Sequence, residues 1–324
     1  MIEAPEHPMR VGAIGVGVHA TTAILPNLPA AGFVLAATCA RHLDRAEAAA
    51  ARFGAGLAFD DPEQMLDEVT LDGVVVVVPV DQFAGVIRMC IRRGVPVFAD
   101  KPAANDAAEA ADLAAAAAES GVPVVVGYMK RFAGAYRLAK ELAAKPEFGH
   151  LTMGSFTWSM GPFAHRFGIR DWLFENPVHH FDLARFFFGE LEDIHVRRCN
   201  GTEHTVAVLA SSESGAVVNI RANTTGSWEQ HNEAVEIFGE GHSLFVDNID
   251  TCTWRPPMRP ECTWRPNYTV PVAGNMTSAT MGFGPELEHF RLVVTEGIAN
   301  ESSIESAAAT LALTSQIADR VLRA

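Results

Sequence analysis

Short apolar runs alternate with amphipathic or alanine-rich segments through residues 1–127 of the chain. The run at 73–78 is a glycine followed by five valines, with a proline next, which is typical of a central parallel strand buried on both faces. Strands are expected at 10–14, 34–39, 73–78, 95–99 and 122–126, and helices between them, including 43–53, 104–119 and one that runs through 91. Such alternation predicts an α/β domain with a parallel, doubly wound sheet.

The pattern changes near Tyr128, and the domains are therefore expected to be 1–127 and 128–324. After a helix near 135–144, apolar and polar positions alternate as in half-exposed strands. These strands are expected at 151–159, 194–199, 205–209, 216–222, 234–238 and 242–246, and helices at 286–295 and 304–322. The second domain is therefore predicted to be α+β, with a large, mostly antiparallel open sheet.

A short internal repeat lies in this second domain. The sequence Cys-Thr-Trp-Arg-Pro occurs at 252–256 and again at 262–266. Ten residues are too few for a solenoid unit. The repeat therefore predicts two arms of a proline-containing hairpin or loop.

Composition narrows the class of protein. The chain has 324 residues, of which 48% are hydrophobic and 20% charged, and two domains are expected at this length. A formal net charge of −14 argues against binding to nucleic acid or to an anionic membrane. Five scattered cysteines without a C-x-x-C pair, and no secretory signal, predict a reduced, cytoplasmic protein. No apolar run reaches the roughly 18 residues of a membrane span.

A glycine-rich turn follows the first expected strand. Residues 15–20, Gly-Val-Gly-Val-His-Ala, form a G-x-G-x-x-A sequence that opens a helix. Gly15 permits the tight turn, Gly17 lets the backbone approach a pyrophosphate, and Ala20 allows close packing of helix on strand. Because the helix N-terminus would hold the anion, Val18 and His19 are also expected to contact it. The sequence therefore predicts a dinucleotide site.

The end of the second strand indicates which dinucleotide binds. Sites for NAD place Asp or Glu there, whereas this chain has Ala40 and Arg41. Ala40 removes the group that would repel a 2′-phosphate, and Arg41 supplies a donor for it, with Arg45 one helical turn beyond. NADP is the expected cofactor, with NAD as the second choice. The remaining expected cofactor contacts are Pro79, Asp100 and Lys101.

Two segments carry the candidate catalytic groups. Lys101 follows the strand at 95–99, and ligands of doubly wound sheets bind at the carboxyl ends of strands. An ammonium group there can stabilise a developing alkoxide. A histidine can exchange the hydroxyl proton near neutral pH. His179 is favoured because Glu175 precedes it by four residues and Asp182 follows it by three, while His180 stays open as the alternative.

These motifs, in this order, resemble the Gfo/Idh/MocA family of glucose–fructose oxidoreductase, inositol dehydrogenase and related enzymes. The family's Glu-Lys-Pro signature is matched by Asp100-Lys101-Pro102, and the segment where its members pass between domains is matched by 127–132. Its acid, His and Asp pattern is matched by Glu175, His179 and Asp182, and residues 286–290 resemble a common helix near its C-terminus. The resemblance runs nearly from end to end.

The resemblance implies a Rossmann domain followed by an α+β domain. It also implies hydride transfer between nicotinamide C4 and a carbinol or carbonyl carbon, often of a sugar or cyclitol. By analogy, Lys101 bonds the reacting oxygen, His179 exchanges its proton, and Glu175 orients or tunes the pair. The expected substrate contacts are Lys101, Tyr128, Arg131, Trp172, Glu175, His179 and His180. Other candidates for the pocket lining are Trp158, Phe163, His165, Arg166 and Arg170.

The chain departs from the family in places that affect the substrate pocket. Glu175 stands where many members have Asp, and Phe83 stands where many have His. Asn176-Pro177 is a good helix start, so Glu175 is also compatible with a position before the helix.

Other functions remain open from the sequence. One is a redox-neutral, NAD-dependent glycoside hydrolase of the same fold, and another is a nonenzymatic NADP-binding regulator. A metal site is not expected, because the adjacent His179 and His180 would point to different sides of a helix. An open antiparallel sheet leaves an apolar face to cover, so a homodimer or homotetramer is expected.

Overall fold

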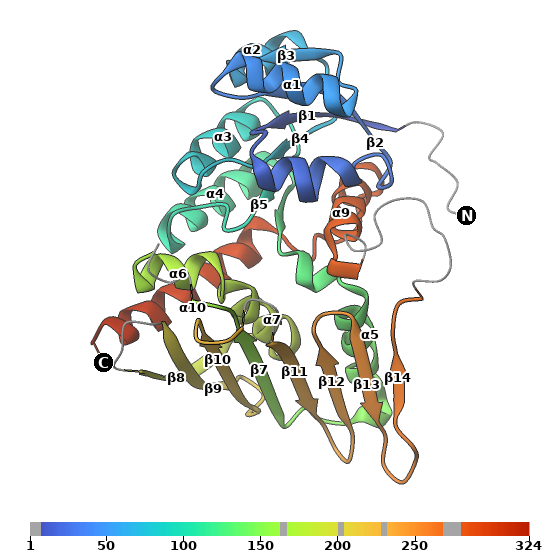
Figure 1. The fold of residues 1–324 in the computed structure, drawn as a ribbon, viewed down its shortest axis with the longest axis vertical. Coiled ribbons are helices and arrows are strands. Elements are labelled where there is room, and N and C mark those ends of the chain that lie inside the picture. Colours follow the sequence, from blue (N-terminus) through green and yellow to red (C-terminus); the bar gives the residue numbers. More distant parts are fainter. Residues whose placement is uncertain (1–7, 163–166, 200–203, 228–231, 268–279, 324) are drawn as a thin grey trace. The chain divides into compact units, whose positions relative to one another are not determined.

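The computed structural model describes residues 8–162, 167–199, 204–227, 232–267 and 280–323. The chain forms two compact units (Figure 1). The first unit consists of 1–129 and 271–309, and the second of 130–270 and 310–324. No helix among the described residues is long and apolar enough to cross a lipid bilayer.

The first unit is built on a parallel sheet with the strand order β3-β2-β1-β4-β5-β6. The strands are β1 (Met9–Ile14), β2 (Phe33–Cys39), β3 (Leu57–Phe59), β4 (Gly73–Val76), β5 (Val97–Asp100) and β6 (Val124–Gly127). This is the order of a Rossmann sheet, with the change of direction between β1 and β4. The predicted doubly wound sheet is confirmed, although the short strand β3 was not expected.

Helices connect these strands as the sequence predicts, with one irregular exception. They are α1 (Leu43–Phe53), α2 (Pro62–Glu68), α3 (Val80–Arg92) and α4 (Ala107–Ser120). The start of α2 is capped by Asp61, whose side chain accepts the N–H of Glu63 at 2.8 Å. Between β1 and β2 the expected helix is replaced by a π-helical turn, η1 (Ala20–Ile24), and a 3₁₀ turn, η2 (Leu25–Asn27). Pro26, which has no N–H to donate, lies in η2.

The first unit also takes in a helix from late in the chain. Helix α9 (Phe283–Glu296) buries Leu287 and Phe290 in the same core as Val11 and Phe98. The Phe98 and Phe290 rings lie 6.1 Å apart. The units therefore differ from the expected domains 1–127 and 128–324, because the apolar face of α9 completes the core of the Rossmann sheet. Helix α10 (Ile304–Arg323) has residues in both units.

The second unit contains a mostly antiparallel sheet with the order β14-β13-β12-β11-β7-β10-β9-β8. Its strands are β7 (Met153–Ser159), β8 (Leu191–Arg198), β9 (Thr205–Ser212), β10 (Val217–Asn223), β11 (Asn232–Phe238), β12 (Ser243–Asp247), β13 (Thr251–Arg255) and β14 (Cys262–Trp264). The β7–β10 pair is parallel. The predicted α+β class is confirmed.

Helices cover part of one face of this sheet. The helical segments of the second unit are η3 (Met129–Phe132), α5 (Gly134–Ala143), η4 (Pro146–Phe148), α6 (Ile169–Glu175) and α7 (Val178–Phe188). Helix α7 packs on β7 and β10, while α5 packs on β12 and β13. Buried and more exposed residues alternate along the central strands, as the sequence predicts for a sheet with one covered face.

The Cys-Thr-Trp-Arg-Pro repeat forms the β13–β14 hairpin. The pairing places Cys252 opposite Trp264 and Cys262 opposite Trp254. The hydroxyl groups of Thr253 and Thr263 lie 3.0 Å apart. The predicted hairpin is therefore confirmed. The repeat places the cysteine of each arm opposite the tryptophan of the other arm. Both cysteines are free thiols.

Candidate active site

The glycine-rich turn follows β1 at the carboxyl edge of the first sheet. Gly15 has φ +92°, and a Cβ there would lie 2.0 Å from the carbonyl oxygen of Val77. Its N–H donates to the carbonyl of Cys39 at 2.9 Å, which ties the turn to the end of β2. A Cβ on Gly17 would meet nothing within 4 Å. The turn is therefore tightly held at Gly15 and open at Gly17, as a phosphate cradle requires.

The segment after β2 is open to solvent at the positions expected to distinguish the two nucleotides. Arg41 and Arg45 are exposed, and Ala40 is partly buried. Helix α1 begins two residues after Arg41, with His42 at its N-cap. Pro79 is exposed at the N-cap of α3, next to the end of β4. These residues flank the glycine turn along the edge of the sheet, and Ala40 leaves no carboxylate there.

Asp100 ends β5 and links three parts of this edge. Its Oδ1 accepts the backbone N–H of Lys101 at 2.9 Å. Its Oδ2 lies 3.4 Å from Nε2 of His19, which belongs to the glycine turn. The His19 ring in turn contacts Phe283 edge-on, with centroids 5.6 Å apart. Lys101 is partly buried and directly follows this carboxylate.

Glu175 and His179 lie on different helices of the second unit. Glu175 is the last residue of α6, Asn176 is its C-cap, and Pro177 is the N-cap of α7. His179 is in the first turn of α7 and is partly exposed. The pair is therefore not an i, i+4 pair on one helix, because Pro177 begins a new helix. This agrees with the second position considered for Glu175, before the helix.

His180 points into the interior of the second unit. Its side chain is 0% exposed, and its Nε2 lies 3.8 Å from Oε1 of Glu233. Glu233 also pairs with Lys130 and accepts a hydrogen bond from the Tyr136 hydroxyl at 2.8 Å. Burial, and then the charge of Lys130, lowers the pKa of His180 from 6.5 to about 3. His180 is therefore neutral near pH 7 and is enclosed by its own unit.

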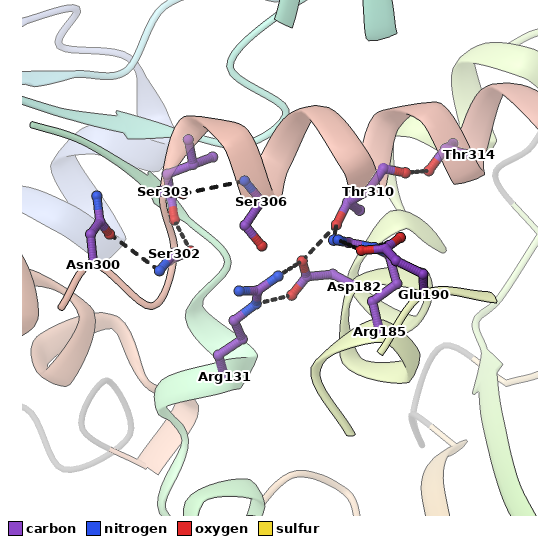
Figure 2. A network of polar contacts seen from close by, with 11 residues as sticks. Arg131, Asp182, Arg185, Glu190, Asn300, Ser302, Ser303, Ser306, Thr310 and Thr314 are labelled. Atoms are coloured by element: carbon purple, nitrogen blue, oxygen red, sulfur yellow. Dashed lines mark hydrogen bonds and ion pairs between the residues drawn. The ribbon is translucent and has the colours of Figure 1, made fainter. Parts of the chain in front are cut away.

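Arg131 and Asp182 form a buried ion pair (Figure 2). Nε of Arg131 donates to Oδ2 of Asp182 at 2.6 Å, and the other nitrogen of the fork pairs with Oδ1. Thr310 on α10 donates to the same Oδ1 at 2.9 Å and accepts from Arg185 at 2.7 Å. The polar face of α7 is thus fixed to η3 and α10, on the helix that carries His179.

Glu286 is a buried acid that sequence reasoning did not select. It lies in the first turn of α9, is 1% exposed, and both carboxyl oxygens are buried without a hydrogen-bond partner among the described residues. Burial, and then the charge of Asp100, raises the pKa of Glu286 well above its usual value. Its sequence signals were the resemblance of residues 286–290 to a common helix of the family and its position four residues before Phe290, and neither pointed to a buried acid.

The other predicted site residues are distributed between the units. Tyr128 and Trp172 are both buried, at 1% and 0% exposure. Trp158 is buried against Trp172, with ring centroids 6.0 Å apart, and Arg170 lies over the Phe174 ring. Phe163, His165 and Arg166 lie outside the described residues. Across the described ranges, no group of three His, Cys, Asp or Glu side chains could hold a metal ion.

Comparisons with known proteins agree with this architecture. Residues 9–128 match the model of an oxidoreductase family with an NAD-binding Rossmann fold, GFO_IDH_MocA. The chain is 26% identical over 264 residues to scyllo-inositol 2-dehydrogenase (NAD⁺) of Bacillus subtilis, covering 75% of each chain. It is 23% identical to myo-inositol 2-dehydrogenase of Thermotoga maritima, covering 76% of this chain and 77% of that one.

Solved structures share the whole fold. A dehydrogenase from Chromobacterium violaceum superposes with a TM-score of 0.88 at 22% identity, over 98% of this chain and 96% of that one. Levoglucosan dehydrogenase in complex with NADH gives a TM-score of 0.87 at 17% identity, over 98% of both chains. The glycine turn and the Asp100-Lys101-Pro102 edge both lie within residues 9–128, which match the Gfo/Idh/MocA family model, and the chain is similar to inositol dehydrogenases over three quarters of its length.

Proposed function

We propose that the protein transfers hydride between a nicotinamide dinucleotide, preferably NADP, and a CH–OH or carbonyl carbon of a cyclitol or other sugar-like substrate. The observation that carries this proposal is the edge of the first sheet, where the Gly15 turn follows β1, Lys101 follows β5 on the other side of β4, and Asp100 links the two. The relatives that are named as inositol dehydrogenases support the substrate class.

The residues of this chain supply the proton chemistry. When bound, the nicotinamide accepts or donates the hydride. Lys101 donates to the reacting oxygen and stabilises the charge that develops on it. His179 takes the hydroxyl proton during oxidation and returns it during reduction. His180 is excluded from this role because its ring is enclosed beside Glu233 and stays neutral near pH 7.

Glu175 is proposed to orient His179 across the break between α6 and α7. It ends α6 four residues before His179, and Pro177 fixes the start of the next helix. Arg131 and Asp182 take a supporting role, because their ion pair holds α7 from within the unit. In this proposal Arg131 positions the helix that carries His179, whereas the sequence suggested that Arg131 contacts the substrate.

The preference for NADP rests on Ala40 and Arg41. Ala40 offers no carboxylate to bind the ribose hydroxyls of NAD, and Arg41 is exposed and can donate to a 2′-phosphate. Dissociation constants for NADPH and NADH, measured by nucleotide fluorescence, test this choice. Arg41→Ala should weaken NADPH binding about tenfold or more and leave NADH binding nearly unchanged. Tighter binding of NADH to the wild type would overturn the preference.

Absorbance of reduced nicotinamide tests the reaction itself. Purified protein is mixed with NADP⁺ or NAD⁺ and a panel of inositols, aldoses and anhydrosugars. Lys101→Met should lose at least about a hundredfold in kcat, because it removes a charged donor from the transition state, and should keep its nucleotide affinity. Lys145→Met, an exposed lysine of the second unit, is the matched control and should turn over like the wild type.

Two outcomes would contradict the proposed reaction. Cleavage of a glycosidic bond with no net change in reduced nucleotide would indicate the redox-neutral hydrolase. Tight nucleotide binding with equal behaviour of wild type and Lys101→Met throughout the panel would indicate a nonenzymatic regulator.

Self-association is the last part of the proposal. The face of the second sheet opposite α7 carries Met153, Leu209 and Val217, which are 40%, 50% and 44% exposed. Val217 lies opposite Met153, and Leu209 lies opposite Asn219, two residues along β10 from Val217. A homodimer or homotetramer would cover them. Light scattering should give twice or four times the chain mass, and a monomer would contradict the assignment.

A further inference from the structure

The side chain of His19 reaches from the glycine turn to the edge that presents Lys101. Its Nε2 lies 3.4 Å from Oδ2 of Asp100, and the two side chains are 45% and 13% exposed. His19 follows β1 and Asp100 ends β5, and both strands pair with β4. Neighbouring strands lie about 4.8 Å apart, so this contact spans two strand spacings. It therefore joins two segments that the backbone of the sheet keeps separate.

The carboxylate of Asp100 uses its two oxygens for two different segments. Oδ1 accepts the backbone N–H of Lys101 at 2.9 Å, while Oδ2 faces the imidazole of His19. The His19 ring also contacts the ring of Phe283 edge-on, with centroids 5.6 Å apart and an angle of 65° between the planes. The imidazole is thus oriented by an aromatic ring and a carboxylate, and the carboxylate connects it to the backbone of Lys101.

The contact between His19 and Asp100 is suited to positioning more than to stability. Ion pairs at this exposure contribute little to the free energy of unfolding. The separation of 3.4 Å exceeds the usual N–H···O distance of about 2.9 Å, so a movement of the turn by about 0.5 Å makes or breaks a hydrogen bond. An N–H at Nε2 can donate to Asp100 from the neutral ring as well as from the imidazolium. The link therefore depends on the place of the turn and is available to both forms of the ring.

We propose that His19 is a positioning residue that couples nucleotide binding at the glycine turn to the placement of Lys101, acting through Asp100. The inference rests on the proposed function, since it takes the turn to be the pyrophosphate cradle. A nucleotide that fixes the backbone of the turn also fixes the imidazole, and the imidazole holds Asp100, whose Oδ1 holds the N–H of Lys101. Because coupling between two sites is reciprocal, His19 also strengthens nucleotide binding.

Hydrogen exchange of the Lys101 amide tests the coupling and needs no sugar substrate. Saturating NADPH, or NADH if it binds more tightly, should slow this exchange about tenfold in the wild type, because it stabilises the hydrogen bond to Asp100. His19→Asn ends one position short of Nε2 and should lose most of this slowing at saturating nucleotide. His150→Asn, at an exposed histidine of the second unit, is the matched control and should behave like the wild type.

A longer amide provides the rescue that distinguishes positioning from packing. His19→Gln places an amide N–H near the position of Nε2 and should restore most of the slowing, whereas His19→Leu should behave like His19→Asn. If His19 only packs against Phe283, the variants should instead rank by apolar bulk, with leucine nearest to the wild type. That ranking would contradict the coupling.

A double substitution tests whether His19 acts through Asp100. The Kd for NADPH, measured by nucleotide fluorescence, should rise about fivefold in His19→Asn, the lower end of the usual range for coupled sites. Asp100→Ala removes the carboxylate, so adding His19→Asn to it should change the Kd no further. Additive effects of the two substitutions would show that His19 does not act through Asp100.

The outcomes separate this inference from the proposed function. Nucleotide binding with equal slowing of Lys101 exchange in wild type and His19→Asn would overturn the role of His19 and leave the proposed reaction standing. Loss of the slowing in His19→Asn, together with failure of every sugar or cyclitol in the absorbance assay, would support the coupling and refute the proposed substrate class. Absence of nucleotide binding by the wild type would overturn both.

Discussion

Replacing Arg131 by methionine should destabilise the second unit by about 3–5 kcal/mol, because it leaves a buried carboxylate without its counter-ion. Arg131 and Asp182 are 4% and 1% exposed. After the substitution, Asp182 keeps the Thr310 hydroxyl at 2.9 Å as a donor but loses both guanidinium contacts. A methionine of similar length fills much of the space, so the loss is mainly electrostatic.

A double variant separates the effect of charge from the effect of packing. The double variant Arg131→Met, Asp182→Asn has no buried charge and should recover a large part of the stability.

Urea unfolding followed by tryptophan fluorescence measures this loss of stability in the second unit, which contains Arg131 and Asp182. All five tryptophans, at 158, 172, 228, 254 and 264, belong to the residues of the second unit. Arg93→Met is the matched control, because Arg93 also binds two carboxylates, Glu63 and Asp67, but at the surface of the first unit. Its unfolding midpoint should equal that of the wild type.

Two results would refute the reasoning on Arg131. A deficit below about 1 kcal/mol would mean that water or another cation replaces the guanidinium. A double variant Arg131→Met, Asp182→Asn that is no more stable than Arg131→Met would mean that the deficit arises from packing and not from the charge of Asp182. A folded Arg131→Met protein with normal stability and a greatly raised KM would instead favour the direct substrate contact suggested by the sequence.

The remaining predictions concern one backbone position and one titration. Gly15→Ala should lower the calorimetric melting temperature, because Gly15 has φ +92° and the new Cβ would lie 2.0 Å from the Val77 carbonyl oxygen. Gly17→Ala, measured without nucleotide, should melt like the wild type, because nothing lies within 4 Å of its Cβ. Equal melting temperatures of the two variants would contradict this reasoning. The pKa of His180 falls from 6.5 to about 3 on folding, so the unfolded chain binds its proton more readily, and folding loses stability as the pH falls through this range. His180→Gln should show a shallower acid loss in tryptophan-detected unfolding, and an unchanged slope would show that His180 does not contribute.

The elements that could be predicted from sequence are those whose signal is local. The valine run at 74–78 and the alternating helices indicated the parallel sheet, because such strands are buried on both faces. The glycine turn was identified from its G-x-G-x-x-A sequence after an expected strand, and the structure shows why Gly15 is needed, since a Cβ there would lie 2.0 Å from the Val77 carbonyl oxygen. The Cys-Thr-Trp-Arg-Pro repeat indicated a hairpin, and β13 and β14 pair as expected.

The missed features depend on contacts distant in sequence. The pattern of α9 resembles any amphipathic helix, and nothing in it specifies that Phe290 stacks 6.0 Å from Phe33 in the core of the first unit. Likewise, the pairing of Lys130 with Glu233 follows from strand register and helix packing, not from local spacing. The sequence could therefore nominate two adjacent histidines, but only the packing of α7 on the sheet distinguishes the enclosed His180 from the partly exposed His179.

Buried acids of the two units differ in their nearest charge. In the second unit, Asp182 and Glu233 each contact a cation, Arg131 and Lys130 respectively. Burial acts to raise the pKa of Glu233, but the charge of Lys130 acts against it, and the pKa of Glu233 is lowered. In the first unit, neither carboxyl oxygen of Glu286 has a hydrogen-bond partner among the described residues, and burial, followed by the charge of Asp100, raises the pKa of Glu286 well above its usual value. Two buried acids thus have pKa values shifted in opposite directions, because the nearest charge is positive in one case and negative in the other.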